Sequence, residues 1–255
     1  MLGVHRDGDV VVLELQREER RNALNLDLCR AIDEAARDAV GDGPAAGGAR
    51  AIVITGQGTA FCSGADLGGV YGEVGAPPAS SASGGFLEAL YGMLHGLALL
   101  PVPIVAAVNG PAIGAGTQLA IACDLRVGDD TARFGVPTAR NGMAVDAWTI
   151  RTLAALSGTG PARRMMLAGE LIDRDEALSH GLVDRAGTLD DALAWAHEIA
   201  TLAPLTLAHN KLVLNGTHHD DAAIEQSFRD VWASDDVREA AQARAEKRTP
   251  VFRGR

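Results

Sequence analysis

Two short, continuously apolar segments constrain the fold most: AIVIT at Ala51–Thr55 and IVAAV at Ile104–Val108. Each is too short for a typical helix and has the composition of a strand buried on both faces of a sheet. A third predicted strand, Val10–Leu15, precedes a segment of helical periodicity from Leu26, and a predicted helix over Phe86–Leu100 precedes the last strand. This alternation predicts an α/β fold with right-handed crossovers.

The helical segments are recognised by their apolar spacing. From Leu26 onward one helical face carries Leu28, Cys29, Ile32, Ala36 and Ala39. Beyond about residue 158 the pattern is mainly helical, and Thr188–Asp191 has the form of a capping box. Two apolar stripes follow it: Ala192, Leu193, Ala196, Ile199 and Ala200, then Ile224, Phe228 and Val231. These amphipathic helices need an apolar partner surface, on the main domain or on another subunit.

Composition excludes several classes of function. The chain has 255 residues, which fit one domain with a small helical appendage, and its net charge of −10 opposes broad nucleic-acid binding. Its three cysteines (Cys29, Cys62 and Cys123) are widely spaced and odd in number, so we expect a reducing compartment and no disulfide framework. The longest apolar run, Leu97–Val108, is too short to span a bilayer, and the start of the chain lacks a signal-peptide pattern. We therefore expect a soluble, cytoplasmic protein.

Common catalytic and metal motifs are missing from the sequence. It contains no GxSxG, HExxH or P-loop and no Cys/His cluster, so we expect no metal site. His218 and His219 lie in a polar stretch and are expected to be solvated. Four other isolated histidines are assigned structural roles: His95, His180, His197 and His209.

A dinucleotide-binding motif is incomplete. Gly114 and Gly116 follow a predicted strand, but Leu119 occupies the third glycine position of GxGxxG. An NAD(P)-binding oxidoreductase is therefore the weakest alternative.

Two turns of small residues favour a different chemistry. FCSGADL (Phe61–Leu67) follows the first apolar strand, and NGPAIGAGTQLAIACD (Asn109–Asp124) follows the second. In the first, Asp66 is a plausible N-cap for a helix. Each turn has unpaired backbone N–H groups where a helix begins, and two such turns side by side can form an oxyanion hole. The alternative is that both are tight turns whose small residues serve packing.

In this order the segments resemble the crotonase (enoyl-CoA hydratase/isomerase) superfamily over nearly the whole chain. The resemblance is carried by RRNALN (Arg20–Asn25), ITGQGTAFCSGADL, PVPIVAAVNGPAIGAGTQLAIACDLRV, FGVPTARNGM, RRMMLAGELIDRDEALSHGLVD and EKRTPVF (Glu246–Phe252).

The resemblance implies a spiral of ββα units over residues 1–187 and a C-terminal helical region over 188–255 that trimerises. The expected assembly is a homotrimer or a hexamer of two trimers, and the sequence leaves both open. It implies a coenzyme A thioester as ligand, with no prosthetic group. The thioester carbonyl would be polarised by the backbone N–H groups of Ala65 and Ala115. The residues expected to contact coenzyme A are Ala23, Leu24, Ala65, Asp66, Leu67 and Lys247, the last of these at the phosphates.

The sequence departs from the family's hydratases at both catalytic glutamates. Gln118 and Thr138 occupy their positions, and neither side chain can exchange protons as a carboxyl group does. Asp146 falls where some superfamily members place a catalytic Asp, and it is equally suited to cap the helix that follows.

Two hypotheses from different classes stay open. The first is a fatty acyl-CoA or enoyl-CoA binding protein of lipid metabolism with weak or absent hydratase activity, which presents acyl groups or delivers them to an acyl-acceptor protein. The second is an active isomerase, or another enolate-forming enzyme, that uses Asp146 as its acid/base. In either case the loop Tyr71–Gly85, rich in Gly, Pro, Ser and Ala, is expected to cover the acyl tail.

Overall fold

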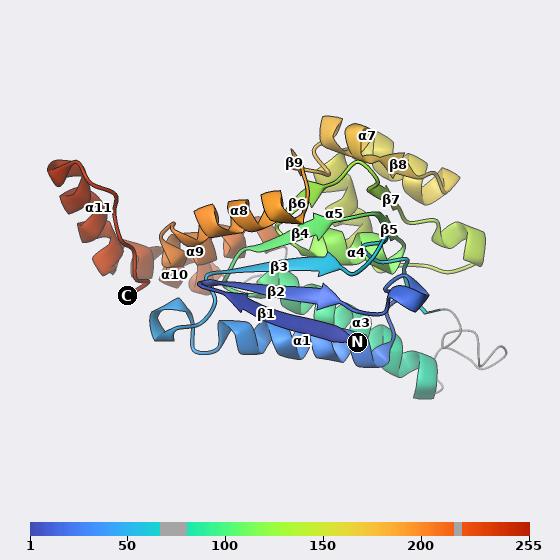
Figure 1. The fold of residues 1–255 in the computed structure, drawn as a ribbon, viewed down its shortest axis with the longest axis horizontal. Coiled ribbons are helices and arrows are strands. Elements are labelled where there is room, and N and C mark those ends of the chain that lie inside the picture. Colours follow the sequence, from blue (N-terminus) through green and yellow to red (C-terminus); the bar gives the residue numbers. More distant parts are fainter. Residues whose placement is uncertain (67–80, 217–220) are drawn as a thin grey trace.

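The computed structural model, which describes residues 1–66, 81–216 and 221–255, is built on one mixed sheet (Figure 1). Its strands, in spatial order, are β1 (Leu2–Asp7), β2 (Val10–Leu15), β3 (Ala51–Gly56), β4 (Ile104–Val108), β6 (Leu125–Gly128) and β9 (Arg185–Ala186). Only β1 runs antiparallel to its neighbour. The three predicted strands are confirmed as β2, β3 and β4, the middle of the sheet.

Alternate residues of the central strands face two separate cores. Ile52 and Ile54 of β3 face the core covered by α1 (Leu26–Val40) and α3 (Ser81–Leu99). On the opposite face, Ala51 and Val53 pack with α8 (Leu189–Ala200). Figure 1 shows α1 and α3 on one side of the sheet and α8 on the other. Both faces of β3 are therefore covered, which explains its wholly apolar sequence.

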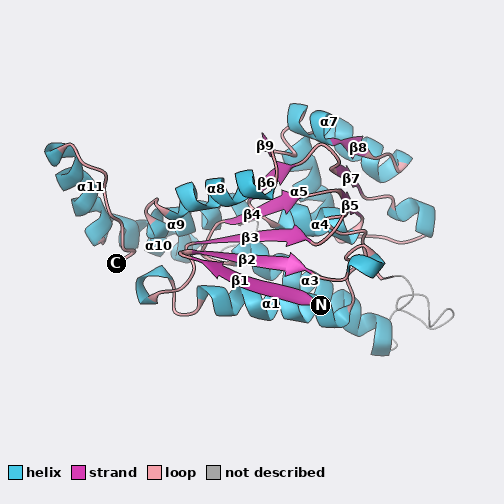
Figure 2. Cartoon of the chain, viewed as in Figure 1, coloured by secondary structure: helices cyan, strands magenta, loops and turns pink. Residues whose placement is uncertain are grey.

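A second, small sheet lies at the carboxyl ends of the parallel strands. It consists of β5 (Pro111–Ile113), β7 (Arg133–Gly135) and β8 (Ile172–Asp173). The surrounding helices are α4 (Ala115–Ala122), α5 (Ala147–Ser157), α6 (Thr159–Arg163) and α7 (Arg174–Ser179). Figure 2 shows this sheet with α4 and α5 at the end of the molecule opposite α11.

The C-terminal helices extend away from the sheet. They are α9 (Pro204–Asn215), α10 (Asp221–Ala233) and α11 (Asp235–Glu246). Phe228 of the second predicted stripe is 53% exposed, and Trp232 beside it is 65% exposed. The capping box at Thr188–Asp191 is confirmed, and α8 after it packs on the sheet. The division of the chain at residues 187/188 stays a prediction.

The structure corrects several predicted boundaries. The helix predicted to begin at Phe86 begins at Ser81, inside the stretch predicted to be the end of the loop Tyr71–Gly85. The rest of that predicted loop lies mostly outside the described residues. Strand β1 and the short strands of the second sheet carry too few alternating residues to be predicted from sequence.

A buried cation anchors α9 to the body. The Lys211 ammonium lies 2.7 Å from the Asp124 carboxylate and donates hydrogen bonds to the carbonyls of Leu97 and Val102. The Lys211 side chain is 7% exposed, so water cannot replace these partners.

Lys211→Ala should lower the free energy of unfolding by about 3 kcal/mol, because it leaves the half-buried Asp124 carboxylate and two carbonyls without their cation. Urea denaturation measures the change. Arg229→Ala is the control, since its ion pair with Glu225 is exposed and its loss should cost less than about 0.5 kcal/mol. Equal losses in the two variants would contradict the anchoring role.

Candidate functional site

The two predicted turns lie side by side because a backbone bridge aligns them. The N–H of Cys62 donates to the Pro111 carbonyl at 3.1 Å, and the N–H of Ile113 donates to the Cys62 carbonyl at 3.0 Å. This pairs Cys62 with Ala112 in parallel orientation. Ala65 and Ala115 each follow a bridged residue by three positions, so the parallel register brings them to neighbouring places.

The N–H group of Ala65 is turned away from its own bridge partner. Leu24 donates its N–H to the Gly64 carbonyl and accepts a bond from the Asp66 N–H, at 2.8 and 2.7 Å. Ala65 lies between Gly64 and Asp66, and in a parallel bridge the N–H of this middle residue points away from its partner, Leu24. Ala115 is the first residue of α4, where helical N–H groups have no partner within the helix. Within the described ranges, neither N–H donates a hydrogen bond.

Two glycines allow the turns to approach this closely. A Cβ atom at Gly116 would lie 2.0 Å from the Cys62 carbonyl oxygen, and one at Gly64 would lie 2.8 Å from that of Ile113. Gly64 also has a φ of +112°, which side-chain-bearing residues rarely adopt. The close approach of the two turns therefore requires small residues in both motifs. That these residues serve packing is compatible with the interpretation that the turns form an oxyanion hole.

Arg17 and Asn22 hold the first turn, and sequence reasoning missed both. The Arg17 guanidinium bonds the Asp66 carboxylate at 2.9 Å and donates to the Ala23 carbonyl. Asn22 is fully buried with a φ of +57° and donates to the carbonyls of Gln57 and Ala60. The sequence does contain a signal for Asn22. In RRNALN an Asn stands between basic residues and the start of an apolar helix, and Asn tolerates the left-handed backbone conformation found here.

A cavity of about 120 Å³ opens beside Ala65 and Ala115. Its apolar lining includes Phe86, Leu87, Leu90, Ile113, Pro137, Met143, Ala144 and Val145. Its polar side chains are those of Ser63, Tyr91, Gln118, Thr138 and Asn141. Among the lining residues that the structure describes, none is Asp, Glu, His, Lys or Arg.

Gln118 and Thr138, the residues expected to stand in place of the hydratase glutamates, both line this cavity. Gln118 lies in α4, is buried, and donates a 2.8 Å hydrogen bond to the Thr149 hydroxyl. Thr138 begins the single helical turn Thr138–Asn141 on the facing wall. The structure therefore brings together Ala65, Ala115, Gln118 and Thr138, as the sequence pattern predicts.

Asp146 caps α5 and also contacts a histidine. One carboxylate oxygen accepts the Thr149 N–H at 3.0 Å, and the other lies 3.0 Å from Nε2 of His95. His95, which stands alone in the sequence and was assigned a structural role, is brought by α3 to Asp146 and against the Trp148 ring, with centroids 5.1 Å apart. Asp146 is not part of the described cavity lining, and both its oxygens are engaged.

Tyr91 connects the cavity to this carboxylate. It lines the cavity from α3, one turn before His95, and the two ring centroids are 6.3 Å apart. Burial raises the pKa of the Tyr91 hydroxyl, and the negative charge of Asp146 raises it further. Hydrogen bonding from the Asp146 backbone and the Gln118 side chain acts in the opposite direction, so both groups lie close to the hydroxyl.

The remaining expected contact residues are distributed differently. Ala23 and Leu24 are buried beside the first turn, where Leu24 contributes its backbone. The carboxylate of Asp66 binds Arg17, while the helix it was expected to cap and Leu67 lie outside the described residues. Lys247 ends α11, which Figure 1 places at the opposite end of the molecule from α4. A single chain therefore does not bring Lys247 to the cavity.

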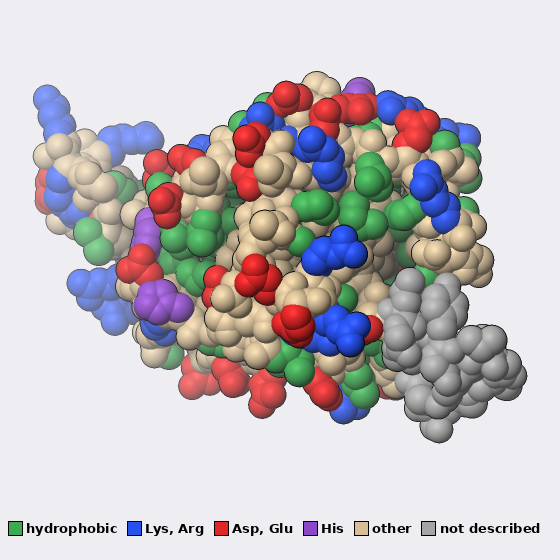
Figure 3. All heavy atoms as spheres, turned by 45° about the vertical axis from the view of Figure 1, so that its right-hand side comes forward, with side chains coloured by type: hydrophobic (Ala, Val, Ile, Leu, Met, Phe, Trp, Pro, Cys, Tyr) green, Lys and Arg blue, Asp and Glu red, His purple; other side chains and the backbone are tan. Residues whose placement is uncertain are grey.

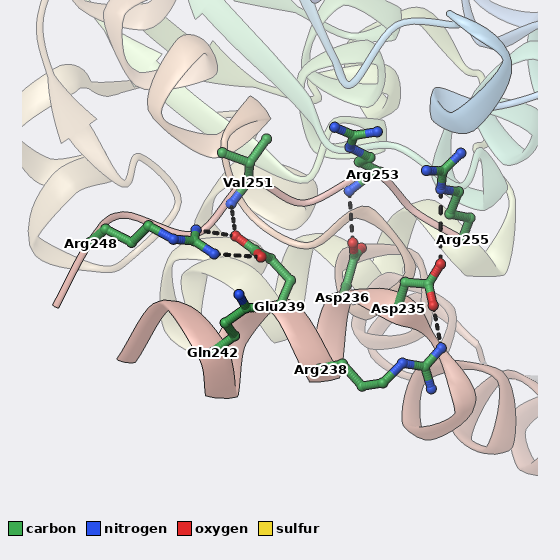
Figure 4. Close-up of a pocket in the computed structure, with 9 residues that line it drawn as sticks. All are labelled: Asp235, Asp236, Arg238, Glu239, Gln242, Arg248, Val251, Arg253 and Arg255. Atoms are coloured by element: carbon green, nitrogen blue, oxygen red, sulfur yellow. Dashed lines mark hydrogen bonds and ion pairs between the residues drawn. The ribbon is translucent and has the colours of Figure 1, made fainter. Parts of the chain in front are cut away.

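A larger cavity of about 560 Å³ lies between α11 and the C-terminal segment (Figure 4). Its charged side chains largely neutralise one another. The Arg248 guanidinium pairs with Glu239, and Asp236 accepts the backbone N–H groups of Arg253 and Gly254. These contacts tie the last residues of the chain to α11 and give this cavity a structural explanation.

Charges are intermixed on the rest of the visible surface. Figure 3 shows acidic and basic side chains interspersed over the body. Residues 1–66, 81–216 and 221–255 contain no group of three or more potential metal ligands. No helix in these ranges is long and apolar enough to cross a membrane.

Comparison with known proteins agrees with the fold and the site. The family model for enoyl-CoA hydratase/isomerase matches residues 5–255. A probable enoyl-CoA hydratase from Mycobacterium tuberculosis is 47% identical over the full length of both chains. A 2,3-dehydroadipyl-CoA hydratase from Escherichia coli is 32% identical over 99% of this chain and 98% of its own.

The solved structures show the same relationship. A protein from Hyphomonas neptunium, described as a member of the enoyl-CoA hydratase/isomerase family, superposes with a TM-score of 0.87 at 28% identity and covers all of this chain and 98% of its own. The fold is thus that of the crotonase superfamily, a class that binds coenzyme A thioesters. The chain belongs to the enoyl-CoA hydratase/isomerase family, and the alternative based on Gly114 and Gly116 as a dinucleotide motif is set aside.

Gly116→Ala should destabilise the protein by about 1–3 kcal/mol, because the added methyl group collides with the Cys62 carbonyl that aligns the two turns. Urea denaturation tests this. Gly160→Ala is the control, since the same atom at Gly160 meets open space. A Gly116→Ala variant as stable as the wild type would show that the turns tolerate wider spacing.

Proposed function

We propose that this chain binds acyl-CoA or enoyl-CoA and polarises the thioester carbonyl with the N–H groups of Ala65 and Ala115, while its hydratase activity is weak or absent. One observation carries the proposal: two N–H groups that donate no hydrogen bond to the described residues adjoin a cavity whose described lining contains no carboxylate. The N–H groups suit a polarised oxygen, and the described lining lacks the pair of carboxyl groups that hydration in this family needs.

Gln118 and Thr138 support the second half of the proposal. Both face the cavity. The Gln118 amide carries no charge, and its hydrogen bond to the Thr149 hydroxyl holds it in place. Hydration requires one group to take a proton from water and another to protonate the α-carbon, and each such role is worth roughly 10²–10⁴-fold. Asp146 does not replace them, because its oxygens are bonded to the Thr149 N–H and to His95.

Such a site suits a protein that holds acyl groups and presents them to an acyl-acceptor protein. The described cavity is small compared with the roughly 300–1,000 Å³ of most ligand sites, so its walls enclose only the acyl carbons nearest the thioester.

We also propose that the chain assembles as a trimer, or as a hexamer of paired trimers, through its C-terminal helices. The exposed apolar side chains of Phe228 and Trp232 supply a surface to be covered. In that case Lys247 would reach coenzyme A phosphates bound to another subunit, since it lies far from the cavity of its own chain.

A second candidate is an enzyme that uses Asp146 as its acid/base. The nearness of Asp146 to Tyr91, which lines the cavity, favours it. It requires the carboxylate to leave His95 or the helix cap when substrate binds.

Isothermal titration with butyryl-CoA and palmitoyl-CoA should show binding, while crotonyl-CoA should lose its conjugated absorbance hardly faster than in buffer. The cause is the uncharged cavity lining. Turnover of crotonyl-CoA at about 1–10³ s⁻¹, as in ordinary enzymes, would overturn the proposal.

Installing both carboxylates should restore hydration. Gln118→Glu combined with Thr138→Glu is expected to raise the hydration rate of crotonyl-CoA by about 10²-fold or more, because it supplies the missing acid and base. Thr138→Gln, with Gln118 unchanged, is the matched control: it has the shape of the double variant without its charges. An equal gain in both variants would mean that shape, not proton transfer, limits the wild type.

A further inference from the structure

Tyr91 has an unusual position for a residue with no assigned role. Of the side chains that line the cavity in the described part of the chain, its phenol is the only one with a titratable proton. It enters from α3, whereas Gln118 enters from α4 and Thr138 from the facing wall. Its hydroxyl lies near the Gln118 amide and the Asp146 backbone, and its side chain lines the same cavity as Ala115.

We propose that Tyr91 carries the proton to and from the α-carbon of the bound thioester, so that the site exchanges α-protons with solvent even though it does not hydrate enoyl-CoA. This rests on the proposed function, because the carbonyl must be held by the Ala65 and Ala115 amides.

The step balances without another reactant. The Tyr91 phenolate takes the α-proton, the C–H electron pair forms the enolate double bond, and the carbonyl π electrons move to the oxygen facing the two N–H groups. Return of a proton from the Tyr91 hydroxyl to the α-carbon reverses the step. When that hydroxyl has exchanged with D₂O, the thioester gains deuterium.

The surroundings of Tyr91 determine its pH dependence. Among the described residues, the titratable groups that face it are the Asp146 carboxylate, from the loop before α5, and the His95 imidazole on α3 itself. From α4 it meets the neutral Gln118, and the wall at residues 137–145 contributes no charged side chain to the described lining. Burial and the Asp146 charge raise the pKa of Tyr91, so the phenolate fraction grows about tenfold per pH unit through the neutral and mildly alkaline range.

The test is deuterium incorporation into butyryl-CoA in D₂O, followed by NMR, with buffer alone as blank. Butyryl-CoA has no double bond to hydrate, so exchange is measured by itself. We expect exchange to rise with pH between about 7 and 10, the region below an ordinary phenol pKa. Tyr91→Phe should lower it by about 10²-fold or more while changing butyryl-CoA affinity only a few-fold.

The sequence offers a sharper version of this test. Tyr71 and Tyr91 are its only tyrosines, so in a Tyr71→Phe background Tyr91 can be titrated directly by tyrosinate absorbance. The exchange profile should follow that titration, and replacing Tyr91 by 3-fluorotyrosine, a more acidic phenol, should move both to lower pH. A structural role for Tyr91 would not shift the profile in this way.

Asp146→Asn separates this proposal from the carboxylate mechanism. Because Asn can also cap α5, the variant should fold, keep exchanging, and show a profile moved to lower pH as the raising charge is lost. Abolished exchange in Asp146→Asn, unchanged exchange in Tyr91→Phe, or a profile flat above about pH 6 would each overturn the assignment.

The binding measurement distinguishes the two levels of failure. If the wild type binds butyryl-CoA but exchanges its α-protons no faster than buffer, only the role of Tyr91 is wrong. If butyryl-CoA does not bind, the proposed function fails and the role of Tyr91 fails with it.

Discussion

The site depends on one backbone bridge, the pairing of Cys62 with Ala112 between segments far apart in the sequence. It joins the ends of two neighbouring parallel strands, β3 and β4, whose register is already set by the sheet. Both segments run in the same direction from the bridge. The N–H groups of Ala65 and Ala115, each three residues beyond it, therefore lie at neighbouring positions. The glycines at 64 and 116 are consequences of this approach, since a Cβ atom at either would collide with a carbonyl oxygen.

Around this bridge the described residues hold the two turns in place and leave the cavity lining without a carboxylate. The first turn is held by Arg17 and Asn22, and the second begins α4. Gln118 has become part of a hydrogen-bond chain, through Thr149, to Asp146 and His95. A carboxylate committed to a helix cap and a histidine is a structural element, and the Tyr91 phenol near it is the titratable group of the described cavity lining.

Much of this was accessible from sequence because it is local. Continuous apolar runs predicted β3 and β4, periodicity predicted α1, and the TLDD segment predicted the cap of α8. The juxtaposition of the two turns also followed, since both turns succeed strands of one parallel sheet. The contacts of His95, Tyr91 and Arg17 were not accessible, because they join side chains distant in the chain and have no periodic signal. The start of α3 was misplaced because Gly, Ser and Ala favour a loop in isolation, whereas here they continue into an apolar helix packed on α1.

The neutral lining of the small cavity has a consequence for how the two ends of a ligand respond to ionic strength. Fixed backbone dipoles in a sheltered cavity are barely screened by dissolved ions, so their hold on the carbonyl oxygen should persist in concentrated salt. Phosphates bound at the surface by an exposed cation such as Lys247 would lose attraction within a Debye length of about 8–10 Å. Under the proposed function, added salt would therefore weaken binding of the nucleotide part of coenzyme A first, while the acyl part stays bound. Such an order of release suits a protein that delivers acyl groups to an acceptor.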